Sequence, residues 1–185
     1  MADTTPSARQ DELLELAYRY VLEHGLADVS LRPLAAAIGS SPRVLLYLFE
    51  SKDGLVRALL ARARRDELDL LDTADGSGLP AVALETWRWL AAEEHRALLT
   101  LWVEGYARSL LDPDGPWGDF AAATVADWLE VLRRAQTPAA RRSAAGLAQR
   151  TAVLALLRGA FLDLLATGDE PRITAAVHHH LRTLD

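Results

Sequence analysis

Three cationic side chains, each with a serine hydroxyl nearby, give the N-terminal third of the chain its chemistry. Arg32 follows Ser30 by two positions, Arg43 follows Ser41 by two positions, and Lys52 is the only lysine of the chain. Arginine presents a planar fork of donors that matches a guanine edge, and hydroxyl and ammonium groups donate to phosphate oxygens. These residues predict nucleic-acid recognition through a few directed contacts.

The overall charge excludes a protein that coats nucleic acid by bulk electrostatics. The chain carries 20 basic and 26 acidic residues, for a formal net charge of −6. Residues 31–60 instead carry four cations against Glu50 and Asp53, a local excess of two positive charges. Because non-specific binding depends on summed cationic charge, any DNA contact must come from this local group.

Composition narrows the class of protein further. A chain of 185 residues with 50% hydrophobic and 25% charged residues is typical of a globular protein with one or two domains. The sequence contains no cysteine, which removes disulfides, thiol nucleophiles and cysteine-ligated zinc. No apolar run reaches the roughly 20 residues of a membrane span, and the N-terminus does not resemble a signal peptide. We therefore expect a cytoplasmic protein without membrane contact.

Helix signals position the candidate cations. Apolar residues at three- and four-residue spacing between Leu13 and Val21 predict a first helix that stops at Gly25. A second helix is expected after the N-cap Ser30, and Gly39 ends it. A third is expected after the N-cap Ser41, with these inner residues: Val44, Leu45, Leu48 and Phe49. Ser51 caps a fourth that starts at Lys52.

Two short helices joined by the tight turn at residues 39–41 are typical of a helix-turn-helix, whose second helix presents its first residues to the major groove. Arg43 is then placed to donate to guanine O6 and N7, while Ser41 and Tyr47 donate to phosphates. Lys52, at a helix N-terminus, also favours a phosphate. The predicted DNA-binding residues are Ser30, Arg32, Ser41, Arg43, Tyr47 and Lys52. Taken singly, each is equally typical of a solvated surface.

The stretch from Arg9 to Leu60 resembles the DNA-binding domain of the tetracycline-repressor (TetR) family of bacterial regulators. The resemblance rests on Gly25, Ser30, Leu34-Ala35, Gly39, Ser41, Leu45, Phe49, Ser51-Lys52-Asp53 and Leu55. Three positions depart from the family: Leu46 replaces the usual tyrosine, Leu48 replaces a residue that is often polar or aromatic, and Arg43 replaces a residue that is small in many relatives. The family's DNA contacts are therefore not carried over to Leu46 and Leu48. We therefore expect this protein to recognise an operator sequence distinct from those of its relatives.

The rest of the chain also predicts helices. They are expected over residues 52–71, 80–90, 93–110, 117–134, 139–166 and from 169 or 170 to near the end. The predicted fold is all-α with about nine helices: a helix-turn-helix domain over residues 1–51, and a second domain over residues 52–185. The resemblance implies that this second domain binds a small effector and dimerises.

An aromatic stripe predicts where an effector would bind. Aromatic-lined clefts between helices with a few polar groups are the usual form of a small-molecule site. The predicted ligand-binding residues are His95, Leu99, Trp102, Tyr106, Trp128, Thr151, Arg158 and Phe161. The same stripe is also typical of a plain helical core. Arg158 interrupts an apolar run and needs a carboxylate, from Asp163, from Glu104 or from an acidic ligand.

The apolar segment 139–166 predicts a dimer. A helix that is apolar nearly all round must be covered on all sides, by the core and by a partner subunit. The expected partner-facing residues are Val153, Leu156, Leu157, Ala160 and Leu164, with Ile173, Val177 and Leu181 from the last helix. A two-fold dimer of the two C-terminal helices would also match half-sites about 34 Å apart.

The sequence contains no recognisable catalytic constellation or cofactor motif. His178, His179 and His180 point about 100° apart on a helix and cannot share one metal, so no metal or cofactor is expected. We predict a dimeric, non-enzymatic transcriptional regulator, most simply a repressor that a small molecule releases from a palindromic operator. The alternative is an all-α ligand-binding protein or enzyme whose N-terminal helices are only structural.

Overall fold

The computed structural model describes residues 8–25, 30–71 and 78–184, and side chains in these ranges except those of residues 67–71. Within them every regular element is helical, which confirms the all-α class. The elements are α1 (Ala8–His24), α2 (Leu31–Ala37), α3 (Pro42–Phe49), α4 (Lys52–Leu71), α5 (Leu79–Ala91), the 3-10 turn η1 (Glu93–His95), α6 (Arg96–Leu111), α7 (Phe120–Arg134), α8 (Pro138–Arg142), α9 (Ala144–Thr167) and α10 (Glu170–Leu181). None of these helices is both long and apolar enough to cross a bilayer.

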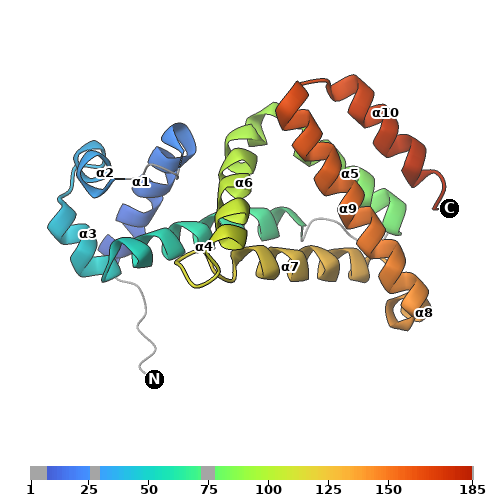
Figure 1. The fold of residues 1–185 in the computed structure, drawn as a ribbon, viewed down its shortest axis with the longest axis horizontal. Helices are drawn as coiled ribbons and strands as arrows, with labels where there is room; N and C mark the ends of the chain where they lie inside the picture. The colour runs from blue at the N-terminus through green and yellow to red at the C-terminus, as the bar shows by residue number, and fades with distance from the viewer. Residues whose placement is uncertain (1–7, 26–29, 72–77, 185) are drawn as a thin grey trace. The chain divides into compact units, whose positions relative to one another are not determined.

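The chain forms two compact units, each described here by itself. The first contains Met1–Asp66 and Thr100–Ala121, and the second contains Glu67–Leu99 and Ala122–Asp185. Helices α4 and α6 therefore each begin in one unit and end in the other (Figure 1). The predicted domain boundary between residues 51 and 52 falls inside the first unit.

Local signals fix the ends of the first helices as the sequence predicts. Gly25 has φ +81° and its amide donates to the Val21 carbonyl, which ends α1. Gly39 has φ +64°, a conformation that favours glycine, at the turn between α2 and α3. The Ser51 hydroxyl accepts a hydrogen bond from the Gly54 amide at 2.9 Å and caps α4. These turns hold α2 and α3 in the helix-turn-helix order.

In the first unit, α1 and α4 are joined by a shared apolar core and by polar contacts. Leu13, Leu34 and Leu59 are fully buried in it. Beside them, the Tyr18 hydroxyl donates to Asp66 Oδ2 at 2.9 Å, and Arg62, which pairs with Asp66, lies 4.8 Å from the Tyr18 ring centroid. Burial of Tyr18, reinforced by its bond to Asp66, raises the pKa of this phenol well above its usual range. α1 and α4 therefore meet through a polar link as well as apolar packing.

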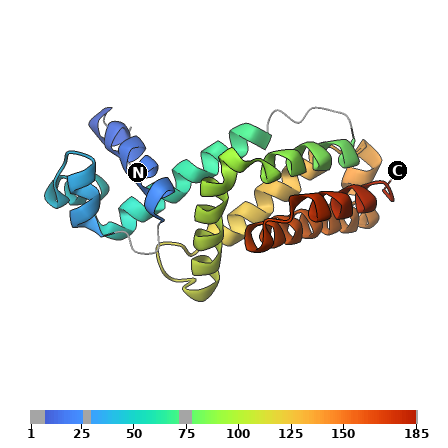
Figure 2. The ribbon, with the colours of Figure 1, turned by 90° about the horizontal axis from the view of Figure 1, so that it is seen from above.

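In the second unit, α5, α9 and α10 pack against one another (Figure 2). Val153 and Val177 are fully buried there, and Trp87 is 1% exposed. The Trp87 Nε1 donates to Thr174 Oγ1 at 2.9 Å, so the indole of α5 has its polar atom satisfied by α10. Two helices about ninety residues apart in sequence are thus joined by a directed bond.

The expected single helix over residues 139–166 is wrong, because the chain breaks at Ser143 into α8 and α9. Ser143 is extended, with φ −92° and ψ 150°, and its hydroxyl accepts from the Gly146 amide at 2.9 Å. A Cβ on Gly146 would lie 1.9 Å from the Ala140 carbonyl oxygen, so only glycine allows α9 to start this close to α8. The described residues therefore hold ten α-helices rather than about nine.

A smaller difference concerns the start of α7, which begins at Phe120 rather than near Trp117. The buried Ser109 hydroxyl donates to the Gly118 carbonyl at 2.7 Å and accepts from the Ala121 amide at 3.1 Å. This bridge from α6 holds the preceding turn in a non-helical course. Trp117 is buried in that turn, with the Arg108 guanidinium 5.9 Å from its ring.

Candidate nucleic-acid interface and effector site

The three predicted DNA-binding cations are exposed and unengaged. Arg32 lies in the first turn of α2, Arg43 in the first turn of α3, and Lys52 at the first residue of α4. Among the described residues, no carboxylate forms an ion pair with any of them. Each cation is therefore available to an external anion without breaking an internal contact.

The predicted hydroxyl contacts differ from one another. Ser30 occupies the N-cap position of α2 but makes no side-chain capping bond, and it is exposed. Ser41 is half-buried, and its hydroxyl accepts from the Val44 amide at 3.3 Å. Since a hydroxyl can accept and donate at once, Ser41 retains a proton for a phosphate while it caps α3.

The exposed face of α3 is broader and more apolar than the sequence analysis predicts. Leu45 and Phe49 are buried, at 1% and 5% exposed, as expected. Val44, predicted to be an inner residue, is instead 38% exposed, so that prediction is wrong. Tyr47 is 83% exposed, and Leu46, excluded from the predicted contacts, is 41% exposed. Counting about 100° per residue from Leu45 would have indicated this outward position for Val44.

The predicted ligand-binding residues fall into different parts of the structure. Trp102 and Tyr106 belong to the first unit, where their rings stack at 4.8 Å between centroids. The second unit contains the other six: His95, Leu99, Trp128, Thr151, Arg158 and Phe161. Within the second unit, Leu99 and Phe161 line one shallow apolar cleft together with Leu90, Arg96 and Leu164.

This cleft is small. It spans about 200 Å³, including space open to solvent. Sites for drug-sized molecules usually span about 300–1,000 Å³. A ligand of that size would therefore need the lining side chains to move. The cleft, with Arg96 among its lining residues, is one candidate for an effector site among the described residues.

Two predicted polar ligand contacts are engaged locally instead. The His95 ring stacks on Trp89 at 4.0 Å between centroids, and its Nδ1 donates to the Trp89 carbonyl at 2.9 Å. Thr151 is exposed on α9, where its hydroxyl donates to the Leu147 carbonyl at 2.8 Å. Neither residue lines the cleft described above.

The arginines of α9 also differ from expectation. Arg158 is half-buried, and Asp163, one of the carboxylates considered for it, pairs with Arg172 instead. The most buried arginine is Arg150, at 9% exposed, which sequence analysis missed. Its Nη1 donates to Gln136 Oε1 at 3.0 Å, so a neutral amide holds this cation.

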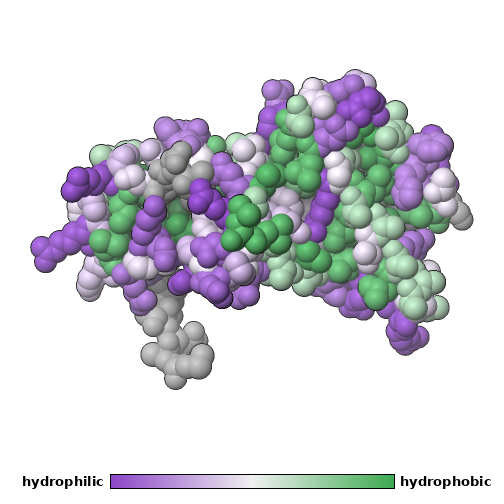
Figure 3. Space-filling model, in the orientation of Figure 1, coloured by the Kyte–Doolittle hydropathy of each residue, from purple (hydrophilic) through white to green (hydrophobic). Residues whose placement is uncertain are grey.

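All but one of the predicted partner-facing residues of the C-terminal helices are buried in the chain's own core, and the exception, Leu156, is half-buried. Those of α9 and α10 that are buried within the single chain are Val153, Leu157, Ala160, Leu164, Ile173, Val177 and Leu181. The exposed residues of α9 instead include small residues, two leucines and a threonine: Leu147, Ala148, Thr151, Ala152, Ala155, Gly159, Leu162 and Ala166. Figure 3 shows a largely apolar surface over α9 on this side. The side chains that face outward were therefore assigned wrongly.

Comparisons with known proteins identify the family. Residues 13–59 match the family model described as bacterial regulatory proteins of the tetR family. Over 173 residues the chain is 30% identical to the HTH-type transcriptional repressor Rv1474c of Mycobacterium tuberculosis, covering 92% of this chain and 89% of that protein. The chain belongs to the TetR family. Membership makes this chain a transcriptional regulator with a DNA-binding domain, and the alternative interpretation as an enzyme is excluded.

Solved structures confirm the TetR fold over most of the chain. A Rhodococcus sp. protein described as a TetR-family transcriptional regulator superposes with a TM-score of 0.73 at 21% identity, covering 96% of each chain. The multidrug binding protein EbrR in complex with proflavin superposes with a TM-score of 0.68 at 24% identity, covering 94% of this chain and 99% of EbrR.

Proposed function

We propose that this TetR-family regulator is a cytoplasmic repressor, which binds a palindromic operator as a homodimer and leaves it when a small-molecule effector binds. The observation that carries the proposal is the group of exposed cations on α2, α3 and α4, which form no ion pair within the described residues. Their unpaired state costs little in water but offers several charge-assisted bonds to DNA phosphates and bases. The repressor activity of the Mycobacterium tuberculosis relative supports the direction of the regulation.

The DNA contacts have distinct roles. Arg43 donates to a guanine edge in the major groove, and Tyr47 and Ser41 donate to the phosphates beside it. Lys52 pairs with a phosphate at the start of α4, while Ser30 and Arg32 contact the opposite backbone. The exposure of these side chains supports the assignment, because none must leave the protein core to reach DNA.

The homodimer forms through the outward faces of α9 and α10. Small residues along α9 allow two helices to approach closely, and Leu162, at 46% exposed, adds an apolar contact. An isologous two-fold contact of this kind places one helix-turn-helix on each half of a palindrome. The apolar surface over α9 supports this arrangement, since an exposed apolar helix face usually marks an interaction site.

The effector binds in the second unit, at the cleft beside Leu99 and Phe161. The other predicted ligand residues do not line this cleft: Trp102 and Tyr106 belong to the first unit, and the second unit contains His95, Trp128, Thr151 and Arg158. Because α6 supplies Arg96 and Leu99 to the cleft and then continues into the first unit, a shift of this helix links the effector to the DNA-binding helices. The effector must bind the DNA-incompetent state more tightly, since only differential affinity moves the equilibrium. The complex of EbrR with proflavin supports a small-molecule effector.

The DNA-binding proposal is tested by selection of duplexes from a random pool with the full-length protein, followed by fluorescence anisotropy at two salt concentrations. We expect one palindromic sequence to bind saturably, with affinity that falls steeply as salt rises. Arg43→Ala should lose this preference, while Arg182→Ala, which removes an exposed arginine at the end of α10, should retain it. Equal binding of all duplexes by the wild type would contradict the proposal.

The effector proposal is tested on the preformed DNA complex. Proflavin is the first probe, and a library of small aromatic and apolar acids is the second. A compound that releases the duplex and changes the tryptophan fluorescence of the protein supports the proposal. Release should fail in a Phe161→Trp variant, which fills the cleft, if the cleft is where that compound binds.

A further inference from the structure

Four exposed residues, Arg43, Val44, Leu46 and Tyr47, form an exposed arc on the surface of α3. In this arc, apolar side chains lie on both sides of the arginine. With about 100° per residue, Tyr47 lies roughly 40° from Arg43, Val44 roughly 100° to the same side, and Leu46 roughly 60° to the other. The buried Leu45 lies on the opposite side of the helix, roughly 200° from Arg43. Val44 and Leu46 therefore flank the central polar pair, Arg43 and Tyr47.

This orientation of α3 is fixed by the rest of the first unit. Phe49 is 5% exposed, and the Gln10 Nε2 of α1 donates to the Leu48 carbonyl at 2.9 Å. A rotation of α3 that buried Val44 would expose Leu45 or break this link to α1. The flanking apolar side chains are therefore presented to the outside by the fold itself.

We infer that Val44 and Leu46 read thymine methyl groups, so that each operator half-site carries a guanine under Arg43 with A·T base pairs on both sides. This inference rests on the proposed operator binding and specifies what the operator contains. The thymine 5-methyl is the apolar group on the base edges of the major groove, so it is the group there that an aliphatic side chain recognises.

The surroundings of the arc favour DNA as its occupant over an apolar protein surface. Arg43 lies inside the arc and Lys52 closely follows α3 in the chain, and both are exposed. Figure 3 shows apolar surface over α3 with hydrophilic side chains projecting beside it. A protein partner would have to bury these cations, which costs free energy unless each is paired. A duplex supplies phosphates for the cations and methyl groups for the apolar side chains together.

The departure from the family at Leu46 has a consequence for specificity. A tyrosine at this position can donate to a phosphate, whereas leucine makes only apolar contacts. Leu46 therefore exchanges a backbone contact, which carries no sequence information, for a contact that senses a base. In this protein the phosphate contact passes to Tyr47, which is 83% exposed.

The test removes single methyl groups from DNA. The operator obtained by selection is resynthesised with deoxyuridine in place of thymidine at one position at a time, which deletes the methyl and keeps base pairing. For the wild-type protein we expect about a fourfold loss of affinity at one position on each side of the guanine, the factor that corresponds to one buried methyl-sized group. Other thymine positions should show no change.

Two variants show which side chain contacts which thymine methyl group. Val44→Ala should lose affinity for the thymine operator and show no further loss with uracil at its own position, and Leu46→Ala should behave likewise at the other position. Leu111→Ala, which truncates a leucine that is 84% exposed elsewhere in the same unit, should retain the wild-type pattern. Equal thermal stability of all three variants would show that folding is intact.

The outcomes separate this inference from the proposed function. If no duplex is selected at all, operator binding itself fails, and the inference fails with it. If an operator binds in an Arg43-dependent manner but uracil has the same effect on Val44→Ala, Leu46→Ala and the wild type, methyl readout is overturned while operator binding stands. A change of oligomeric state in Val44→Ala or Leu46→Ala would also overturn it, since the arc would then contact another protein chain.

Discussion

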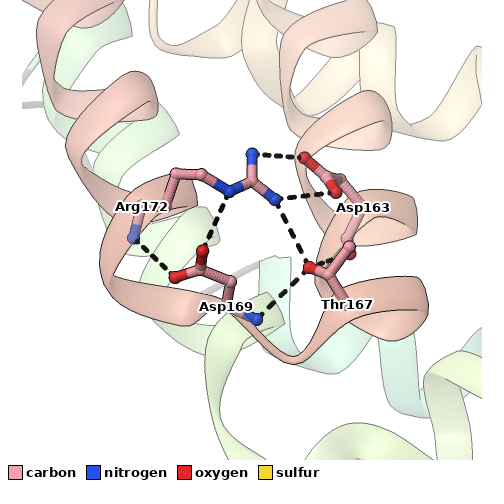
Figure 4. A network of polar contacts seen from close by, with 4 residues as sticks. All are labelled: Asp163, Thr167, Asp169 and Arg172. Atoms are coloured by element: carbon pink, nitrogen blue, oxygen red, sulfur yellow. Dashed lines mark hydrogen bonds and ion pairs between the residues drawn. The ribbon is translucent and has the colours of Figure 1, made fainter.

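Arg172 and Asp163 are joined by two parallel hydrogen bonds, 2.9 Å from Nη1 to Oδ2 and 3.0 Å from Nη2 to Oδ1 (Figure 4). The same guanidinium donates from Nε to Asp169 Oδ2 at 3.0 Å, and Asp169 caps α10 by accepting from the Arg172 amide at 3.3 Å. One arginine therefore ties the end of α9 to the start of α10. In the proposed dimer, this corner fixes the angle between the two helices that form the interface.

Loss of the Asp163 carboxylate should change how stability depends on pH. Hydrogen bonding to Arg172 holds the pKa of Asp163 below its usual range. A carboxylate with a lowered folded-state pKa stabilises the fold above its ordinary pKa, and this contribution disappears as pH falls through the folded-state pKa. Asp163→Asn should therefore be slightly less stable near neutral pH, with a shallower decline below about pH 4.

Urea unfolding at a series of pH values measures this effect, at one fixed protein concentration because dimerisation also contributes. Asp114→Asn, in the loop before α7, is the matched control, since no salt bridge engages Asp114 within the described residues. An identical decline in wild type and Asp163→Asn would show that the corner adds no pH-dependent stability.

Loss of the buried Arg150–Gln136 contact should lower the unfolding free energy more than loss of the neighbouring Gln136–Gln149 contact. Gln136 is 5% exposed, accepts from Arg150 Nη1 and donates to the Gly146 carbonyl at 2.8 Å. Gln136→Ala leaves a buried guanidinium and a buried carbonyl without this partner, which should cost about 1–3 kcal/mol of unfolding free energy. Gln149→Ala, which removes a half-buried partner of the same amide, should cost less than about 1 kcal/mol. Equal losses in urea unfolding would contradict the prediction.

Local chemistry explains what the sequence predicted well. Gly25, Gly39 and Ser51 act on backbone groups within four residues of themselves, so their effect is readable without tertiary structure. The break at Ser143 escaped prediction because Gly146 is required by its approach to Ala140, and that approach exists only in the folded chain. Sequence patterns alone describe α8 and α9 as one continuous helix.

The orientation of α9 was unpredictable for a related reason. A helix that is apolar nearly all round has no hydrophobic stripe to indicate which side faces the core. Packing against α5 and α10 selects Val153 and Leu157 for the inside and leaves Gly159 outside. The pairing of Asp163 with Arg172 likewise depends on the angle of a turn. The exposure of Arg32, Arg43 and Lys52 was easier to predict, because charged residues usually remain in solvent.

Arg43 and Lys52 should affect DNA binding in different ways. Arg43→Ala removes a base contact, so it should weaken binding by about 1–3 kcal/mol and relax the preference at one operator position. Lys52→Ala removes a phosphate contact, so it should weaken all duplexes alike and reduce the slope of log affinity against log salt by about 1. Anisotropy titrations against the selected operator and its single-base variants distinguish the two. The assignment fails if Lys52→Ala alters base preference while Arg43→Ala does not.

Gly159 offers a direct test of the proposed dimer. Gly159 is exposed, and a Cβ at this position would meet nothing within 4 Å in the single chain, so we expect a larger side chain to leave the fold intact. Replacement of a helical glycine by leucine should even favour the helix, by up to about 1 kcal/mol. In a dimer that brings two α9 helices together, however, Gly159→Leu would hold the helices apart. We expect this variant to elute as a monomer in chromatography with light scattering and to lose operator affinity, while Ala126→Leu on the exposed side of α7 remains dimeric. A Gly159→Leu protein that stays dimeric and binds DNA normally would place the dimer interface elsewhere on the chain.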